Sequence, residues 1–160
     1  MLDYFIRSVQ KSDYESIVTV YNSNPLFLLN HLGVERIDES FISEESAIMR
    51  NSGFYSCVIV DGGNTSVQGV LDYKPGREVY LSLFMLASEL QGKGIGHNIY
   101  HAFEQQMRRN GSQTIRIDVV NDYSRHAVPF WKKLGYTEEE NLSLTWRNKK
   151  SSAVVMRKKL

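Results

Sequence analysis

The first third of the chain alternates apolar and polar positions with the period of an α-helix. Residues 12–21 open with Ser12 and Glu15 at the spacing of a capping box, and apolar side chains then recur on one helical face. A weaker pattern of the same kind covers residues 38–50. The pattern therefore predicts two helices in this part of the chain.

The period changes to two in the middle of the chain, which is typical of strands. Tight turns containing glycine, asparagine and proline separate the alternating runs. The three predicted strands cover residues 54–60, 67–73 and 78–86. Because two short turns follow one another, we expect these strands to form an antiparallel meander.

The second half returns to a helix and then to further strands. Apolar residues at three- and four-residue steps predict an amphipathic helix over 95–109, and residues 114–120 alternate as a strand. A strand, a helix and a strand in this order favour a right-handed crossover to a parallel neighbour. Residues 124–134 predict a short helix, and residues 142–147 and 153–156 predict a closing hairpin. The expected fold class is α/β, with a mixed sheet and helices on both faces.

Length and composition describe an ordinary globular chain. The 160 residues, of which 42% are apolar and 23% charged, suffice for a single domain, 1–160, with a core of its own. A formal net charge of +1 argues against a protein whose main task is to hold nucleic-acid phosphates. No apolar run predicts a membrane span and no signal peptide is evident, so the expected location is the cytoplasm. The single cysteine, Cys57, lies in an apolar run and is expected to be a buried thiol.

The stretch QGKGIG, residues 91–96, places three glycines between a predicted strand and a predicted helix. The first amides of a helix lack partners within it, and the helix dipole favours negative charge at that end. Glycine lets the backbone approach a ligand closely and reach positive φ. The loop therefore predicts a site for a phosphate or pyrophosphate.

Two common phosphate-binding loops do not match this spacing. A Walker loop ends in Gly-Lys-Ser/Thr, but Gly92 and Lys93 are followed by Gly94. The dinucleotide fingerprint G-x-G-x-x-G also fails, because no reading of the loop places a glycine at its third position. Nucleotide binding remains an alternative only because glycine loops are generic.

The motif that does fit is Q-x-x-G-x-G, formed by Gln91, Gly94 and Gly96. A second motif, A-x-x-F-W-x-x-x-G-Y, follows over residues 127–136. With these two motifs at this distance, the chain resembles the GNAT superfamily of N-acetyltransferases over nearly its whole length. The resemblance implies a GNAT-like fold and acetyl-CoA as the donor substrate.

The resemblance also implies where the donor would bind. The loop amides would cradle its pyrophosphate, the end of the third meander strand would pair with the pantetheine arm, and an amide near Leu86 would polarise the thioester carbonyl. An asparagine that often contacts the cofactor is replaced here by Ser124, and Asn121 lies three residues earlier. The cofactor-contacting residues implied in this way are Phe84, Met85, Leu86, Gln91, Gly92, Lys93, Gly94, Ile95, Gly96, Asn121, Ser124, Phe130 and Trp131.

The motifs do not name the acid and the base of an amine acetylation. Many family members have a tyrosine that protonates the leaving thiolate where this chain has Trp131, whose indole does not titrate usefully. Tyr123 and Tyr136 are the substitutes, unless they are packing residues. For the base, Asp118 lies where some relatives carry a carboxylate, unless it is merely a solvent-facing strand residue. Glu78 acting through a water molecule is the alternative base.

The sequence does not identify the acceptor. The aromatic candidates for its site, which are equally compatible with the core, are Phe27, His31, Tyr55, Tyr73 and Tyr80. His97 and His101 lie one helical turn apart but lack a third ligand, so no metal is predicted.

The preferred interpretation is an N-acetyltransferase that acts on a primary amine, either of a small molecule or of a protein N-terminus or lysine. The alternative is a non-catalytic module that binds or senses acyl-CoA, and Trp131 is the residue that favours it. Neither interpretation involves a nucleic acid or a membrane, and a homodimer is consistent with the resemblance.

Overall fold

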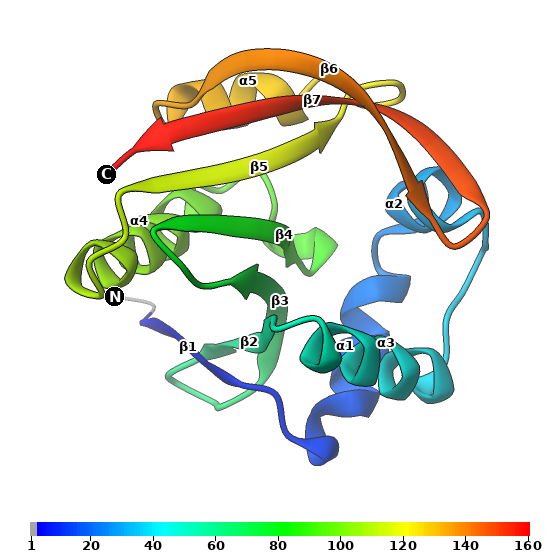
Figure 1. Ribbon diagram of the computed structural model, residues 1–160. Helices are drawn as coiled ribbons and strands as arrows, with labels where there is room; N and C mark the ends of the chain where they lie inside the picture. The colour runs from blue at the N-terminus through cyan, green and yellow to red at the C-terminus, as the bar shows by residue number, and fades with distance from the viewer. Residues whose placement is uncertain (1–2) are drawn as a thin grey trace.

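Seven strands form one mixed sheet in the computed structural model, which describes residues 3–160. The strand order is β1-β2-β3-β4-β5-β7-β6, and helices cover both faces (Figure 1). This arrangement confirms the expected fold class. The strands are β1 Tyr4–Ser8, β2 Tyr55–Asp61, β3 Val67–Lys74, β4 Glu78–Leu86, β5 Thr114–Val120, β6 Thr137–Trp146 and β7 Lys149–Lys159. The helices are α1 Tyr14–Asn22, α2 Pro25–Phe27, α3 Glu39–Asn51, α4 Ile95–Arg109 and α5 Ala127–Lys133, with 3-10 turns at Lys11–Asp13 and Ser88–Leu90 and a π-helical turn at Leu28–Leu32.

β2, β3 and β4 form the antiparallel meander that the two short turns between them predict. Alternate residues of β2 divide between two cores, with Cys57 and Ile59 on one face of the sheet and Val58 and Val60 on the other. Burial raises the pKa of the Cys57 thiol to about 11. This cysteine is therefore a packing residue, as its apolar surroundings predict.

Different helices build the two cores. The larger core joins α4 and α5 to one face of the sheet, and the buried residues that α4 contributes to it are Ile99, Tyr100, Phe103 and Met107. The smaller core joins α1, the π-helical turn and α3 to the other face. The crossover from β4 through α4 to β5 therefore lies on one face, and the helices that precede the meander lie on the opposite one (Figure 1).

The N-terminal region differs from the prediction in two ways. The sequence pattern predicted no strand at β1, because a strand of five residues at the edge of the sheet is too short to show a clear alternation. The capping box assigned to Ser12 and Glu15 is wrong, since Asp13 instead accepts a hydrogen bond from the amide of Gln10, 2.7 Å away. Arg7 of β1 adds two hydrogen bonds to the same carboxylate, both at 2.8 Å.

The C-terminal elements are confirmed in type and corrected in length. α5 begins at Ala127, so it is shorter than the helix predicted over 124–134. Pro129 is its third residue, where a missing N–H costs little because the first amides of a helix have no partner within it. The closing hairpin is present, but its strands are longer than predicted and leave only Arg147 and Asn148 between them.

β4 and β5 run side by side only at their beginnings. Their parallel ladder holds three residue pairs and ends with Tyr80 opposite Arg116. Beyond it β4 stays with β3 while β5 pairs with β7, so the two strands form a fork (Figure 1). The pairing of β3 with β4 also shifts register here, which makes Ser82 the extra residue of a β-bulge. The fork leaves an internal edge of the sheet without a partner strand.

The tip of the β6–β7 hairpin reaches the helices that precede the meander. Trp146 packs edge-on against Phe27, with ring centroids 6.0 Å apart. Arg147 pairs with Glu45 of α3 at 2.9 Å, and its guanidinium lies 4.5 Å from the centre of the Phe41 ring. The hairpin tip therefore packs against α2 and α3.

Replacing Asp13 with asparagine is expected to lower the free energy of unfolding by about 2 kcal/mol, because Arg7 and the Gln10 amide lose a charged acceptor. The Arg7 hydrogen bonds hold the pKa of the Asp13 carboxyl below its ordinary value, although burial opposes them. Since the folded pKa is depressed, this contribution is complete above the ordinary pKa of about 4 and is lost as the pH falls below it. Urea denaturation at neutral and at acidic pH measures the difference between wild type and Asp13→Asn. A difference that does not shrink in acid would contradict this account.

Candidate active site

The glycine loop is open at the start of α4. Gly92 and Gly94 have φ values of +74° and +77°, and apart from their chain neighbours no heavy atom of the described residues lies within 4 Å of a Cβ built at either position. Gly94 is the N-cap residue and has no side chain to cap the helix, so the first amides of α4 have no hydrogen-bond partner among residues 3–160. Lys93 is exposed beside them. The loop thus presents free donors and a positive charge, an arrangement suited to a phosphate or pyrophosphate.

Polar side chains fix this loop to the end of β4. The Gln91 side-chain nitrogen donates to the Asn24 side-chain oxygen at 2.7 Å and to the Leu86 carbonyl at 3.0 Å. The Asn24 side-chain nitrogen donates to the same carbonyl, also at 3.0 Å. Just after α1, the Ser23 hydroxyl accepts from the amide of Ser88 at 3.1 Å. The side chain of Gln91 therefore holds the glycine loop to Asn24 and to the end of β4.

The edge of β4 that faces the fork carries free backbone groups. The Ala87 amide donates to the Gln68 carbonyl of β3 at 2.8 Å. Because alternate residues of a strand direct their amides to opposite sides, Phe84 and Leu86 direct theirs away from β3 and into the fork. Met85 belongs instead to the core beneath α1. The structure brings Phe84 and Leu86 to the open loop and turns Met85 away from it.

α5 brings two aromatic residues to the same place. A Cβ added at Gly96 would lie 3.6 Å from Leu86 and 3.7 Å from the Phe130 ring, so both pack against the first turn of α4. Trp131 lies next to Phe84, with ring centroids 6.1 Å apart. The indole can donate a hydrogen bond but does not release a proton near neutral pH. Trp131 therefore packs beside Phe84 at this end of the fork, and its indole is not suited to serve as an acid.

Tyr136 lies in the core of α4 and α5. Its hydroxyl is 2.8 Å from that of Tyr100, and only 3% of its surface is exposed. Burial raises its pKa above the ordinary value of a tyrosine. An acid role for Tyr136 stays a prediction that this position does not favour.

Tyr123 pairs with His31 beyond the end of β5. The Tyr123 hydroxyl lies 2.8 Å from Nε2 of His31, whose ring stacks on Phe27 with centroids 4.3 Å apart. Burial lowers the pKa of His31 to about 4, so this imidazole is neutral at neutral pH. Burial and the nearby Asp122 raise the pKa of Tyr123 to about 12, so the phenol keeps its proton. The pair provides an oriented, protonated hydroxyl at one arm of the fork.

Asp118 lies at the start of the fork with both oxygens engaged. It accepts hydrogen bonds from two nitrogens of Arg116, at 2.9 and 3.1 Å, and from the Tyr80 hydroxyl at 3.1 Å. Its side chain is only 5% exposed, which excludes the solvent-facing alternative. Burial, followed by the charge of Asp118, raises the pKa of Tyr80 to about 12. The network ties β4 to β5, and the role of Asp118 as the base stays a prediction.

The other candidates for the donor site lie in the connection from β5 to α5. Asn121 is exposed, and its backbone amide donates to the Ser152 carbonyl at 3.1 Å. The Ser124 hydroxyl accepts from the amide of His126 at 3.3 Å, just before α5. Their contact with a cofactor stays a prediction.

The aromatic candidates for the acceptor site divide between the two faces. Phe27 and His31 lie beside the hairpin tip, and Tyr80 lies at the fork on the same face. Tyr73 packs against the core of α4, and Tyr55 packs on Tyr73 with ring centroids 5.5 Å apart. Only the first three face the region where an acceptor could approach the fork.

The sequence predicts neither a metal site nor a membrane-spanning helix. Within residues 3–160, no three histidine, cysteine, aspartate or glutamate side chains are grouped so that they could hold a metal ion. His97 packs edge-on against Phe130, with ring centroids 5.1 Å apart, and His101 lies against Tyr100. None of the described helices has the length and apolar character needed to cross a membrane.

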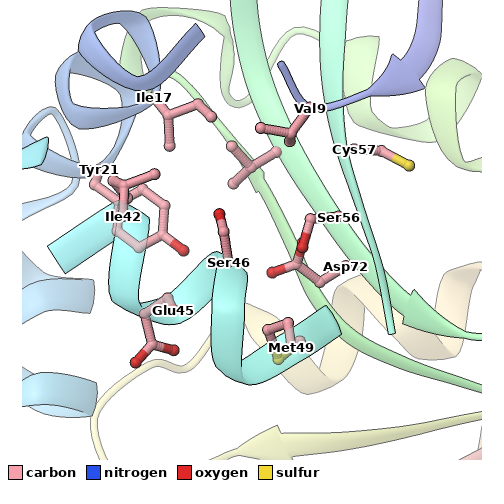
Figure 2. A pocket seen from close by; sticks show the side chains of 11 residues that line it. Val9, Ile17, Tyr21, Ile42, Glu45, Ser46, Met49, Ser56, Cys57 and Asp72 are labelled. Atoms are coloured by element: carbon pink, nitrogen blue, oxygen red, sulfur yellow. The ribbon is translucent and has the colours of Figure 1, made fainter. Parts of the chain in front are cut away.

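Asp72 is a polar residue near the fork that the sequence analysis missed. It lies on β3, opposite Ser56 of β2, and lines a cavity of about 30 Å³ beneath α1 and α3 (Figure 2). Burial raises the pKa of its carboxyl to about 7, and a hydrogen bond from Ser56 opposes this shift. The signal was present in the alternation of β3: since Val70 points into this core, the residue two positions later must point the same way.

Comparisons with known proteins agree with this geometry. The family described as acetyltransferase (GNAT) domain matches residues 28–160. No curated protein matches the chain at a significant level. Among solved structures, an acetyltransferase from Thermus thermophilus is similar with a TM-score of 0.80 and 16% identity, covering 99% of this chain and 98% of that one.

Two further structures share the fold along their whole length. A ribosomal-protein-alanine N-acetyltransferase from Brucella melitensis is 18% identical, with a TM-score of 0.69 and coverage of 98% of this chain and 99% of that one. The PaiA N-acetyltransferase from Thermoplasma acidophilum, in complex with coenzyme A, is 18% identical, with a TM-score of 0.67 and coverage of 99% of this chain and 100% of that one. The likeness to these structures shows the fold, and the family match over most of the sequence shows that this chain belongs to the GNAT acetyltransferase family.

Proposed function

We propose that this protein transfers an acetyl group from acetyl-CoA to a primary amine. The observation that carries the proposal is the fork, because the unpaired edge of β4 leads directly to the open loop at the start of α4. A donor with a pyrophosphate and an amide-containing arm matches free helix amides followed by a free strand edge. The coenzyme A bound to the PaiA structure supports the same choice of donor.

The loop and β4 would hold the donor through their backbone. The amides from Gln91 to Gly96 would bind the pyrophosphate, and Lys93 would add positive charge. Phe84 and Leu86 would pair with the pantetheine arm. An amide of this edge, near Leu86, would polarise the thioester carbonyl, and such a donor is worth about 3 kcal/mol of transition-state stabilisation.

The transfer needs a neutral amine and a proton for the leaving thiolate. The amine nitrogen forms a bond to the acetyl carbon, the carbon–sulfur bond breaks, and the nitrogen passes its proton to a base, for which Asp118, or Glu78 through a water molecule, is the proposed candidate. Tyr123 is the proposed proton donor to the thiolate, because its hydroxyl is protonated and oriented by His31, whereas that of Tyr136 lies in the core. Its effect is modest because the leaving thiol is itself acidic, with an ordinary pKa of about 8.5.

The acceptor would approach from the side of the hairpin tip. The aromatic side chains that meet there are Phe27, His31, Tyr123 and Trp146. The Brucella relative is named for an alanine of a ribosomal protein, which makes a protein N-terminus one candidate acceptor. A small-molecule amine or a lysine side chain offers the same nucleophile.

A non-catalytic module that binds acyl-CoA is the second candidate. Trp131 favours it, because it stands where the resemblance implies a tyrosine and lies beside Phe84 of β4. Both candidates require donor binding, and only the first requires turnover with an amine.

Acetyl-CoA is expected to stabilise the protein against heat. A ligand at about 100 times its dissociation constant adds roughly 2.7 kcal/mol to the free energy of unfolding. A thermal melt with acetyl-CoA, with ATP and NADH as controls, measures the shift. No shift, or an equal shift with ATP, would contradict the choice of donor, and a shift without turnover of any amine would favour the binding module.

Gly94→Trp is expected to weaken acetyl-CoA binding by about tenfold or more, because an indole would fill the space before the α4 amides and strain a left-handed residue. Gly111→Trp is the matched control. Gly111 has a φ of +84° and an equally empty Cβ position, but it follows the far end of α4. In calorimetric titrations both variants should lose similar stability, and only Gly94→Trp should lose the ligand. Normal binding by Gly94→Trp would place the donor site elsewhere.

Tyr123→Phe is expected to lower kcat by about tenfold to a hundredfold while the KM for acetyl-CoA changes little, since the hydroxyl acts on the leaving group. Tyr136→Phe is the comparison, because it removes a hydroxyl from the core and should lower the melting temperature without lowering kcat. Steady-state kinetics with an amine that the protein acetylates measures both. Equal kcat values for Tyr123→Phe and wild type would remove Tyr123 from the mechanism.

A further inference from the structure

One short segment between α1 and α3 connects the two arms of the fork. This crossing segment, residues 24–33, contains α2 and the π-helical turn. At one end Asn24 bonds to the last residue of β4, and near the other end His31 bonds to Tyr123, which follows β5. The crossing segment therefore links the donor side of the fork to the proposed proton donor.

Asn24 joins four parts of the structure. Its side-chain nitrogen donates to the carbonyls of Val20 in α1 and Leu86 in β4, both at 3.0 Å. Its side-chain oxygen accepts from the side chain of Gln91 in the glycine loop at 2.7 Å. Its own carbonyl accepts from the amide of Leu28, where the π-helical turn begins, at 3.1 Å. The start of the crossing segment is thus tied to the loop and to the end of β4 by one side chain.

These contacts form a closed triangle of hydrogen bonds. The side-chain nitrogen of Gln91 donates both to Asn24 and to the Leu86 carbonyl, which also accepts from Asn24. An asparagine amide has two donors and an acceptor, whereas an aspartate only accepts and a hydroxyl has a single donor. Because the triangle uses the donor and the acceptor groups of Asn24, a displacement of the loop at Gln91 acts directly on this residue.

The rest of the crossing segment is firmly packed. Leu28 is fully buried and Leu32 is 7% exposed, so both anchor the segment to the core beneath α1. The Ser151 hydroxyl of β7 donates to the Asn30 carbonyl at 3.3 Å. His31 lies within this stretch. Hydrogen-bonded turns with packed side chains carry a displacement from one end to the other.

We propose that Asn24 is a positioning residue that sets the Tyr123 hydroxyl relative to the glycine loop. The inference rests on the proposed function, since it takes acetyl-CoA as the ligand of the loop and Tyr123 as the proton donor. A ligand on the loop amides displaces Gln91 and with it Asn24. The crossing segment then carries the displacement to His31, whose ring holds the Tyr123 hydroxyl.

The two tryptophans of the chain lie at the two ends of this path. Trp131 lies beside Phe84 of β4, and Trp146 lies edge-on to His31 with ring centroids 6.3 Å apart. In fluorine NMR of protein labelled with fluorotryptophan, acetyl-CoA should shift both signals of the wild type, which Trp131→Phe assigns. In Asn24→Ala, acetyl-CoA should still shift the Trp131 signal and should leave the Trp146 signal in place.

Asn22→Ala is the matched control. Asn22 lies at the end of α1, and its side-chain hydrogen bonds, at 2.9 and 3.1 Å, go to the backbone of Ile37 rather than to the glycine loop. Both variants should lose stability, and only Asn24→Ala should uncouple the Trp146 signal from acetyl-CoA. If Asn24→Ala does not fold, Gln91→Met removes the same link at an exposed position of the loop and decides by the same criterion.

Steady-state kinetics with an amine that the protein acetylates tests the end of the path. Asn24→Ala should lower kcat by about fivefold or more while the KM for acetyl-CoA changes little. In a Tyr123→Phe background the same change should have no further effect, because two residues that act through one hydroxyl are not additive. Asn22→Ala should keep the kcat of the wild type.

Three results would overturn the role of Asn24 and leave the donor in place. They are a Trp146 signal that still responds to acetyl-CoA in Asn24→Ala, a wild type in which only the Trp131 signal shifts, and a kcat loss that is equal with and without the Tyr123 hydroxyl. Loss of the Trp146 response in Asn22→Ala would also overturn it, because any loosening of the crossing segment would then suffice. A wild type in which neither signal shifts would instead overturn acetyl-CoA as the donor, and this inference with it.

Discussion

The structure depends on a strand edge that the sheet leaves unpaired. Backbone amides and carbonyls removed from water need partners, and an unpaired edge otherwise recruits another strand. At the fork the protein meets this need in part, since the side chains of Asn24 and Gln91 both donate to the Leu86 carbonyl. The amides that stay free lie beside the open loop of α4. The same constraint therefore shapes the fold and defines the candidate donor site.

Polar contacts fix how far the fork opens. At its start, Asp118 of β5 accepts a hydrogen bond from Tyr80 of β4, directly beyond the last pair of the parallel ladder. At its far end, one short segment touches both arms, because Asn24 reaches β4 and His31 reaches Tyr123 beyond β5. The segment between α1 and α3 thus couples the donor side to the side where an acceptor would approach.

The two faces of the sheet differ in how completely apolar side chains fill them. On the α4 face the inward residues of the meander join one continuous core. On the α1 face, Asp72 interrupts the apolar series that Val58, Val60 and Val70 continue. A carboxyl at an inward strand position breaks the local rule for a core. Asp72 lies on the strand next to β4, where it pairs with Leu83.

Local patterns in the sequence determined the meander, α4 and the glycine loop, because alternation, helical period and clustered glycines are signals within a few residues. The spacing of two motifs was enough to indicate the family. Those local signals did not indicate the short edge strand β1 or the hydrogen bond from the Gln10 amide to Asp13. Periodicity does not encode the pairing of β1 with β2 or the contact between these two residues. Only the tertiary structure distinguished Tyr123 from Tyr136, because the first meets a histidine 92 positions away and the second is enclosed by α4. It also decided the surroundings of Asp72, since an alternating pattern gives the direction of a side chain but not the helices that cover it.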